Sequence, residues 1–262
     1  PTAGHPMTTP TQRKNLIRKL LKGIETGDPA AAAVVNESKY IQHNPQTQEG
    51  SEGLTALFAR LSKTNPRVNI VRAFADGDFV FAHTEYDFAT RRIGFEVFRF
   101  EADQAVEHWD NIQPRRGPNP SGRSMVDGPT TATDLDRTDE NRRLVRSLAQ
   151  DVLIGRRLDL LPRYVDAEHL AQHNPDLTDG IAAWRLALQA TRDSAPAIHY
   201  QHLHRILAEG SFVLTVCEGT LAGVHSAFYD LFRLANAKVV EHWDTIEPVA
   251  PRSEWKNDNG KF

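Results

Sequence analysis

The sequence QHNP at residues 42–45 is repeated at residues 172–175, and the sequence VEHWDNIQP at residues 106–114 is repeated as VEHWDTIEP at residues 240–248. The two motifs occur in the same order in both halves, and their separations differ by only a few residues. This spacing is far longer than the period of a solenoid repeat, so it indicates two complete domains of one fold.

The length and composition agree with a chain of two domains. The 262 residues carry a net charge of −3, with 40% apolar and 25% charged residues, which is ordinary for a globular protein. We expect five segments: an N-terminal tail (1–12), a first domain (13–114), a linker (115–139), a second domain (140–250) and a C-terminal tail (251–262). The linker is rich in Pro, Gly, Ser, Thr and Asp. The tail is polar, so we expect it to be loose apart from Trp255 and Phe262.

Charge and cysteine usage restrict the partners and the compartment. The near-balanced charge gives no sign of a nucleic-acid surface. The single Cys217 excludes an internal disulfide and fits a reducing compartment, so we expect a cytoplasmic protein with Cys217 as a buried thiol. No apolar run approaches the roughly 18 residues of a membrane span, and no signal peptide is visible. We assign no function to His5, which precedes Met7.

Each half begins with a helical pattern and continues with a strand pattern. Apolar residues follow helical spacing first and alternate later, which predicts three helices and then about four antiparallel strands, an α+β domain. Gly27 and Gly155 are expected to end the first helices. Asn before Pro is displaced from the α region, so His43 and His173 should lie at an element boundary or in an extended stretch. The predicted helices are 16–24, 29–38 and 50–63 in the first half, and 144–153, 158–166 and 179–192 in the second.

Three helices, an early His-Asn-Pro segment and a late Glu-His-Trp-Asp strand resemble the SnoaL-like polyketide cyclases. These belong to the nuclear-transport-factor-2-like superfamily, with its cystatin-like α+β cone. The resemblance implies two tandem cones, each with a deep and mostly apolar pocket at its open end. Members are usually single domains that dimerise through their sheets. The tandem chain therefore predicts a pseudo-dimer within one chain, which would be monomeric or would form a homo-oligomer.

The last strand of each half supplies the strongest candidate residues. His108 and Asp110 lie two residues apart, so they share a strand face at about 7 Å between Cβ atoms. His242 and Asp244 repeat this pair. The resembling cyclases use an Asp on a late strand as the acid and base of an aldol closure, and Asp110 and Asp244 have that residue type and position. His43 and His173 are expected to enter from the helical side as further catalytic residues.

The first half offers additional polar candidates for the pocket. Phe81, His83 and Glu85 share one face of a preceding strand and are expected to bind substrate together with Asn44. The second half has Val216 in the place of His83, and it adds the cluster His199, His202 and His204. The first half therefore has the more polar predicted pocket, and we expect it to be the active half.

Each candidate also has a structural interpretation. His43 could cap a helix or satisfy buried carbonyl groups, and His83 could be a surface histidine of a strand. Trp109 and Trp243 fit a core position better than a site. Residues shared between the halves are also shared for folding reasons, which weakens every functional inference from the repeat.

Four functions remain open at this stage. Imidazole and carboxyl groups suit proton transfer near neutral pH, which fits a cyclase or isomerase that needs no cofactor. Opening of an epoxide by an activated water needs similar groups. A non-catalytic module that binds an apolar ligand is the third. The fourth is a metal-dependent oxygenase, because His43, His108 and Asp110 have the residue content of a facial-triad iron site. The expected partner in every case is a small apolar molecule, and the sequence has no phosphate-binding loop.

Overall fold

The computed structural model describes residues 8–47 and 49–262; the first seven residues, His5 among them, lie outside this range. The chain divides into two compact units. Unit 1 comprises Pro1–Asp110 together with Ala250–Phe262, and unit 2 comprises Asn111–Val249. The C-terminal segment therefore belongs to the unit that is distant from it in sequence.

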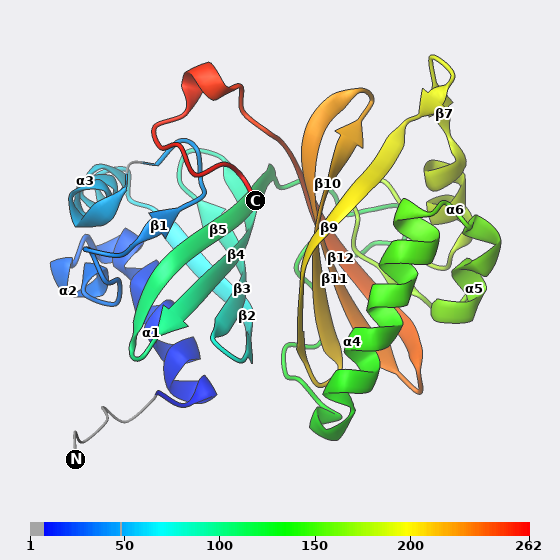
Figure 1. The fold of residues 1–262 in the computed structure, drawn as a ribbon, viewed down its shortest axis with the longest axis horizontal. Helices are drawn as coiled ribbons and strands as arrows, with labels where there is room; N and C mark the ends of the chain where they lie inside the picture. Colours follow the sequence, from blue (N-terminus) through cyan, green and yellow to red (C-terminus); the bar gives the residue numbers. More distant parts are fainter. Residues whose placement is uncertain (1–7, 48) are drawn as a thin grey trace. The chain divides into compact units, whose positions relative to one another are not determined.

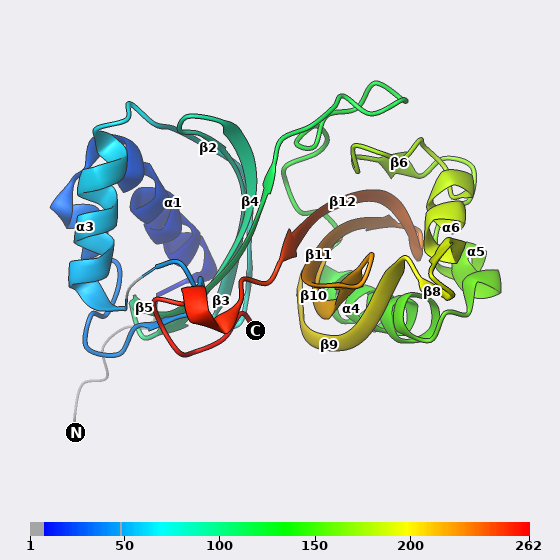
Figure 2. The ribbon, with the colours of Figure 1, turned by 90° about the horizontal axis from the view of Figure 1, so that it is seen from above.

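Unit 1 is a five-stranded sheet curved around helices, as Figure 1 and Figure 2 show. The strand order is β1-β5-β4-β3-β2, antiparallel except for the parallel pair of β1 and β5. Its elements are α1 (Pro10–Thr26), α2 (Pro29–Ala32), β1 (Ile41–Gln42), α3 (Gly50–Ser62), β2 (Arg67–Asp76), β3 (Phe79–Asp87), β4 (Arg91–Glu101) and β5 (Gln104–Pro114).

Local sequence explains where α1 begins and ends. Thr9 and Gln12 form a reciprocal capping box at its start, where Pro10 occupies the first helical position. This satisfies backbone donors that a helix start leaves free. The helix ends at Gly27, which adopts the left-handed conformation with φ of 67° that glycine tolerates best. The apolar face, which includes Ile17 and Leu20, is buried against the sheet.

Unit 2 repeats this topology with the strand order β6-β12-β11-β10-β9, and β6 is parallel to β12. Its first helix α4 continues into a π-helical segment, Leu148–Ile154, and ends at Gly155. The elements of unit 2 are α4 (Thr138–Ser147), α5 (Leu161–Tyr164), β6 (Ala171–Gln172), α6 (Ala182–Gln189), the hairpin β7 (Thr191–Arg192) and β8 (Ala195–Pro196), β9 (Ile198–Glu209), β10 (Phe212–Leu221), β11 (Val224–Ala235) and β12 (Lys238–Pro248). Short 3-10 helices lie at Leu135–Arg137 and Leu158–Leu160 in unit 2, and at Arg252–Glu254 in unit 1.

The predicted α+β fold is confirmed in both units, but some elements differ in number and length. The second helix of unit 1, α2, ends at Ala32 and not at residue 38 as predicted. The QHNP segments themselves supply the short parallel strands β1 and β6, so each sheet has five strands where about four were expected. His43 and His173 directly follow these strands, at the boundary predicted for them. The third helix of unit 2 is α6, which is shorter than the predicted 179–192 because β7 and β8 take over its end.

Each sheet buries both of its faces. The face toward the helices carries the apolar cores, with Val80 and Phe98 in unit 1 and Val213 and Phe232 in unit 2. We call this the inner face. Residues of opposite parity form the outer face, where Phe95 is also fully buried. Hydrophobicity on both faces removes the alternation that would identify the inner face from sequence.

Two segments pack onto the ends of the units by hydrogen bonds. The tail strap, residues 250–262, belongs to unit 1, where Asn259 Nδ2 donates to the Gln42 carbonyl and the Trp109 indole donates to the Phe262 carbonyl. The linker strap, residues 115–128, belongs to unit 2, where Asn119 Nδ2 donates to the Gln172 carbonyl. The tail is therefore not loose as expected, because its polar side chains satisfy backbone groups of unit 1.

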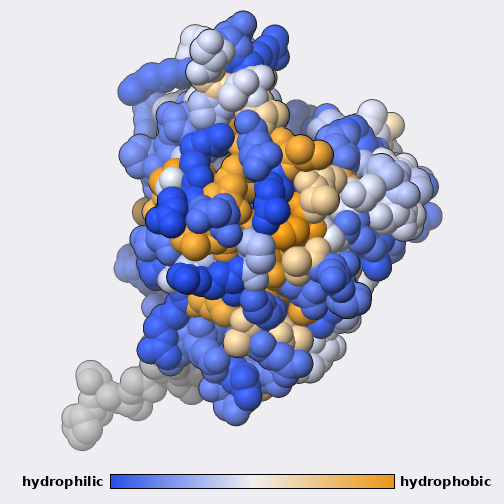
Figure 3. Space-filling model, turned by 90° about the vertical axis from the view of Figure 1, so that its right-hand side faces the viewer, coloured by the Kyte–Doolittle hydropathy of each residue, from blue (hydrophilic) through white to orange (hydrophobic). Residues whose placement is uncertain are grey.

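The surface on the side of α5 and α6 has apolar side chains in its middle and hydrophilic ones around them (Figure 3). Cys217 is a buried free thiol, as predicted, and burial raises its pKa. Over the described residues, no helix is both long and apolar enough to cross a membrane.

Candidate functional site

The inner face of unit 2 brings His242 and Asp244 from β12 beside Asp230 from β11. Asp230 is paired with Asp244 in the register of the two strands, and Phe232 is paired with His242. All three polar side chains are buried, with Asp244 9% exposed and the others 1% exposed. Buried ionisable groups need partners, and each of these has them.

His242 is held by both of its ring nitrogens. Its Nε2 lies 2.7 Å from Asp230 Oδ1, and its Nδ1 lies 2.8 Å from Gln172 Oε1. Gln172 Oε1 also accepts the backbone N–H of Asn174, which fixes the oxygen toward these donors. His242 Nδ1 therefore donates, and a proton is shared between His242 Nε2 and Asp230.

Tyr200 completes this network from β9, because its hydroxyl donates to Asp230 Oδ2 at 2.8 Å. Burial lowers the pKa of His242, but the hydrogen bond to Asp230 and the charge of Asp244 outweigh it and raise that pKa overall. Burial and the charge of Asp230 raise the pKa of Tyr200 well above its usual value. Trp184 of α6 stacks on the His242 ring at 4.7 Å between centroids. The imidazole is therefore fixed in position and favoured in its charged form.

Asp244 is the carboxyl group that faces a cavity. Asn174 Nδ2 donates to both of its oxygens, at 3.1 and 2.9 Å. The Asn174 amide is oriented by the backbone N–H of Asp176, which donates to its Oδ1. Burial raises the pKa of Asp244 to about 6, the charge of His242 opposes this rise, and the charge of Asp230 adds to it. A carboxyl with this pKa exchanges protons readily near neutral pH.

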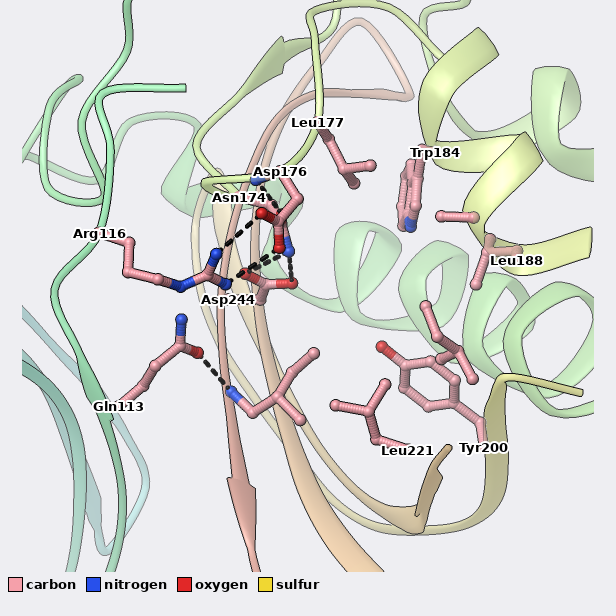
Figure 4. Close-up of a pocket in the computed structure, with 13 residues that line it drawn as sticks. Gln113, Arg116, Asn174, Asp176, Leu177, Trp184, Leu188, Tyr200, Leu221 and Asp244 are labelled. Carbon is pink, nitrogen blue, oxygen red and sulfur yellow. Dashed lines mark hydrogen bonds and ion pairs between the residues drawn. The ribbon is translucent and has the colours of Figure 1, made fainter. Parts of the chain in front are cut away.

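The cavity has a volume of about 300 Å³ and a polar and an apolar end (Figure 4). This size is at the lower limit of small-molecule sites. At the polar end, Arg116 pairs with Asp176, and Gln113 Oε1 accepts the backbone N–H of Ile246 at 2.9 Å. The apolar end is lined by Leu177, Trp184, Ala187, Leu188, Ile198, Leu221 and Ile246, with the ring of Tyr200.

Unit 1 builds the same arrangement from the matching motif residues. His108 Nε2 lies 2.7 Å from Glu96 Oε2, and His108 Nδ1 lies 2.7 Å from Gln42 Oε1. Asn44 Nδ2 donates to Asp110 Oδ2 at 2.9 Å. Asp110 Oδ2 is 3.9 Å from His108 Nε2. The predicted pairs His108–Asp110 and His242–Asp244 thus lie together on the inner faces.

The electrostatics of unit 1 differ through Lys261. This lysine lies in the tail strap and is only 4% exposed. Burial and the charge of Glu96 raise the pKa of Asp110, whereas the charges of His108 and Lys261 oppose the rise. Burial lowers the pKa of His108, but the hydrogen bond from His108 to Glu96 outweighs burial and raises that pKa overall. The charge of Lys261 opposes this rise.

Glu96 and Asp230 were not predicted as site residues from the sequence. They differ in type, so the repeat does not show them as identical residues, although each lies twelve positions before its histidine. Gln42 and Gln172 were visible inside the repeated motif, yet their role in orienting the histidines was not inferred. Asn44, predicted to bind substrate, holds Asp110, and its counterpart Asn174 lines the unit 2 cavity.

His43 and His173 do not join the inner-face groups, contrary to expectation. His43 Nε2 lies 2.7 Å from Glu107 Oε2, and its ring stacks on Trp109 at 4.7 Å. His173 repeats this with Glu241 and Trp243. Glu107 and Trp109 have the opposite strand parity to His108, so these histidines follow the outer face. Their Nδ1 atoms contact strap carbonyls, those of Gly260 and Ser124.

The predicted substrate-binding residues Phe81, His83 and Glu85 were also placed on the wrong face. In the β3–β4 register His83 pairs with Phe95, and its ring packs edge-on against Phe95 on the outer face. His83 Nδ1 lies 2.6 Å from Arg72 Nη1. The inner face of β3 carries Tyr86 instead, whose hydroxyl donates to Glu96 at 2.6 Å. The expected gathering of three imidazoles in one pocket was therefore wrong.

The proposed metal set also changes. His43 cannot join His108 and Asp110, because it lies with the outer face of the sheet. Among the described residues, two other groups could hold an ion, each with ligand atoms within 4.8 Å of one another. They are Glu96, His108 and Asp110 in unit 1, and Asp230, His242 and Asp244 in unit 2. In the second-half histidine cluster, His204 pairs with Glu218 at the surface.

Comparison with known proteins gives a match to one family model within the first repeat. Residues 17–108 match the sequence profile of the SnoaL-like domain. No curated protein sequence matches the chain.

Several solved structures have similarity to part of the chain. TsrD from Streptomyces laurentii is 19% identical with a TM-score of 0.36, and the match covers 40% of this chain and 91% of that one. An NTF2-like protein of unknown function from Cytophaga hutchinsonii is 19% identical with a TM-score of 0.34, over 41% and 94% of the two chains. An LEH-like epoxide hydrolase from M. tuberculosis is 15% identical with a TM-score of 0.35, over 40% and 84%.

Proposed function

We propose that this chain, a tandem member of the SnoaL-like family in the nuclear-transport-factor-2-like superfamily, is an enzyme that moves a proton at a carbon next to a carbonyl group. The reaction class would be a cyclisation or isomerisation of a small apolar molecule. One observation supports the proposal most: Asp244, whose pKa burial raises to about 6, lines a cavity that has an apolar end. The sequence favoured the first half as the active one, but this cavity favours unit 2.

The residues of unit 2 can be given distinct roles. Ionised Asp244 would remove the proton and, once protonated, return it to another atom of the substrate. The charge of His242 would keep the pKa of Asp244 from rising further under burial and the charge of Asp230, so that the base form prevails at neutral pH. The developing enolate oxygen would meet the amide N–H groups of Gln113, whose oxygen is already held by Ile246. These groups supply acid and base without a cofactor.

The test is exchange of the α-protons of 2-tetralone in D2O, followed by NMR. Asp244→Asn should slow exchange by at least about 100-fold, the usual contribution of a general base. Exchange in the unchanged protein should rise with pH and level off above about 6, as Asp244 ionises. Asp110→Asn is the matched comparison. If only Asp110→Asn abolishes exchange, the chemistry belongs to unit 1, and if neither does, the proposal is wrong.

A metal-dependent reaction is the second candidate, favoured by the carboxylate–imidazole–carboxylate group of Asp230, His242 and Asp244. These are ligand types that divalent transition metals accept. Elemental analysis of the purified protein, with Asp230→Asn as the variant, separates it from the first candidate. Incorporation of labelled water oxygen into a diol would instead indicate epoxide opening. Binding of 2-tetralone without exchange would indicate a binding module.

A further inference from the structure

The polar end of the unit 2 cavity holds a cation that is already neutralised. Arg116 Nη1 donates to Asp176 Oδ1 at 2.8 Å, and Arg116 Nη2 donates to Asp176 Oδ2 at 3.0 Å. Such a two-point contact uses the face of the guanidinium that would otherwise bind a carboxylate of a ligand. Figure 4 shows this pair beside Asn174 and Asp244, at the opposite end from Trp184 and Leu188.

The charges that line the cavity do not favour an anion. Among the described residues that line the cavity, Arg116 is the single permanent cation, and Asp176 balances it. The other carboxylate that lines the cavity is Asp244, whose two oxygens accept hydrogen bonds from Asn174 Nδ2. An anionic ligand would therefore meet a negative carboxylate without a free positive partner, and its desolvation would not be compensated.

The size of the cavity sets a second limit. Its volume of about 300 Å³ equals roughly ten water molecules in the liquid. A molecule of one or two rings fills such a space, with its apolar body against Trp184 and Leu221 and its oxygen toward Gln113.

We infer that the unit 2 site takes an uncharged mono- or bicyclic ketone, and that the Arg116–Asp176 pair is a gate that rejects carboxylates of the same size. This inference rests on the proposed function for the choice of a ketone. The gate itself depends only on the ion pair and the lining charges. It predicts that freeing Arg116 from its partner converts the site toward anion binding.

The experiment compares the binding of 2-tetralone and 2-naphthoate by calorimetry at about pH 7.5. The unchanged protein should prefer the ketone, and Asp176→Asn should shift the affinity ratio toward the carboxylate by roughly twofold to fivefold, the scale of an ion pair whose side chains are both more than half exposed. The ratio is the readout, since damage to the fold weakens both probes together.

The chain provides a matched control in a second ion pair between the linker strap and the same loop. Arg123 Nε donates to Asp179 at 2.9 and 3.1 Å, and neither residue lines the cavity. Asp179→Asn should leave the ratio unchanged. The inference is overturned if the unchanged protein prefers 2-naphthoate, or if Asp176→Asn does not shift the ratio beyond the effect of Asp179→Asn. Selective ketone binding without proton exchange would refute the proposed function but would still support the role of the Arg116–Asp176 pair in rejecting carboxylates.

Discussion

Unit 1 and unit 2 make the same hydrogen-bond network with tyrosines from different strands. Tyr86 of β3 donates to Glu96 in unit 1, whereas Tyr200 of β9 donates to Asp230 in unit 2. Position 219 is the counterpart of Tyr86, and it is a glycine. In both units a tyrosine hydroxyl donates a hydrogen bond to a buried carboxylate, and that carboxylate also forms a hydrogen bond with a histidine. The position that supplies the hydroxyl is free to change.

The surrounding residues change with the tyrosine. In unit 1, Gly94 leaves space for the Tyr86 ring, which a Cβ at that position would overlap. The counterpart of Gly94 in unit 2 is Phe228, which packs on Tyr200 at 4.4 Å between centroids. In unit 2, Gly219 leaves space for the backbone of β9, because a Cβ there would overlap the carbonyl oxygen of His199. Each tyrosine thus depends on a small residue nearby.

The largest effect that would sharpen this comparison is a gain of stability in Asp244→Asn. Because the folded pKa of Asp244 is raised to about 6, its favourable contribution is present below its unfolded pKa and is lost as pH rises through the folded value. Asn removes that loss, so the variant should be more stable by roughly 3 kcal/mol at about pH 8 and almost unchanged at about pH 3. Urea unfolding at both pH values measures it. A less stable variant at about pH 8 would contradict the burial argument.

The next effect concerns the two glycines. Gly219→Ala should lose about 1–3 kcal/mol of stability, as overpacking typically does, because the overlapping atom belongs to the backbone. Gly94→Ala should also destabilise, but its overlaps are with two side chains, those of Tyr86 and Thr84. Tyr86→Ala should therefore remove part of the cost of Gly94→Ala in a double-mutant cycle. Equal costs of Gly94→Ala with and without Tyr86 would show that the ring is not the obstacle.

The smallest effect tests the lysine that distinguishes unit 1. Removing its charge in Lys261→Met should raise the pKa of Asp110, because that charge opposes the rise produced by burial. The pKa of Asp244 in unit 2 should stay the same. Carboxyl carbon NMR across a pH titration measures both residues. Lys256→Met, at an exposed position in the same strap, is the control and should move neither.

The sequence predicted the architecture and half of the site. Repeated motifs and the change from helical to alternating spacing indicated two α+β units, and the two-residue spacing placed His108 with Asp110 and His242 with Asp244. These inferences depend on local geometry alone, because residues two positions apart on a strand point to the same face of the sheet.

The rest depended on register, which one sequence does not give. A shift of one residue between strands exchanges inner and outer faces, and His83 was placed on the wrong one. Because Phe95 on the outer face is buried as fully as the inner core, hydrophobicity could not correct the error. Glu96 and Asp230 were missed for a related reason, since only strand pairing brings them beside the histidines. The arrangement of the units as a pseudo-dimer stays a prediction.

The straps have a consequence for anyone who dissects this protein. The tail strap is encoded after β12 of unit 2 but completes unit 1, and the linker strap follows β5 but completes unit 2. Cutting the gene directly after the linker strap would give two fragments, each of which carries the strap that completes its partner and lacks the strap that completes itself. Two co-expressed halves would have to bind each other's straps to restore the contacts that the intact chain makes within itself.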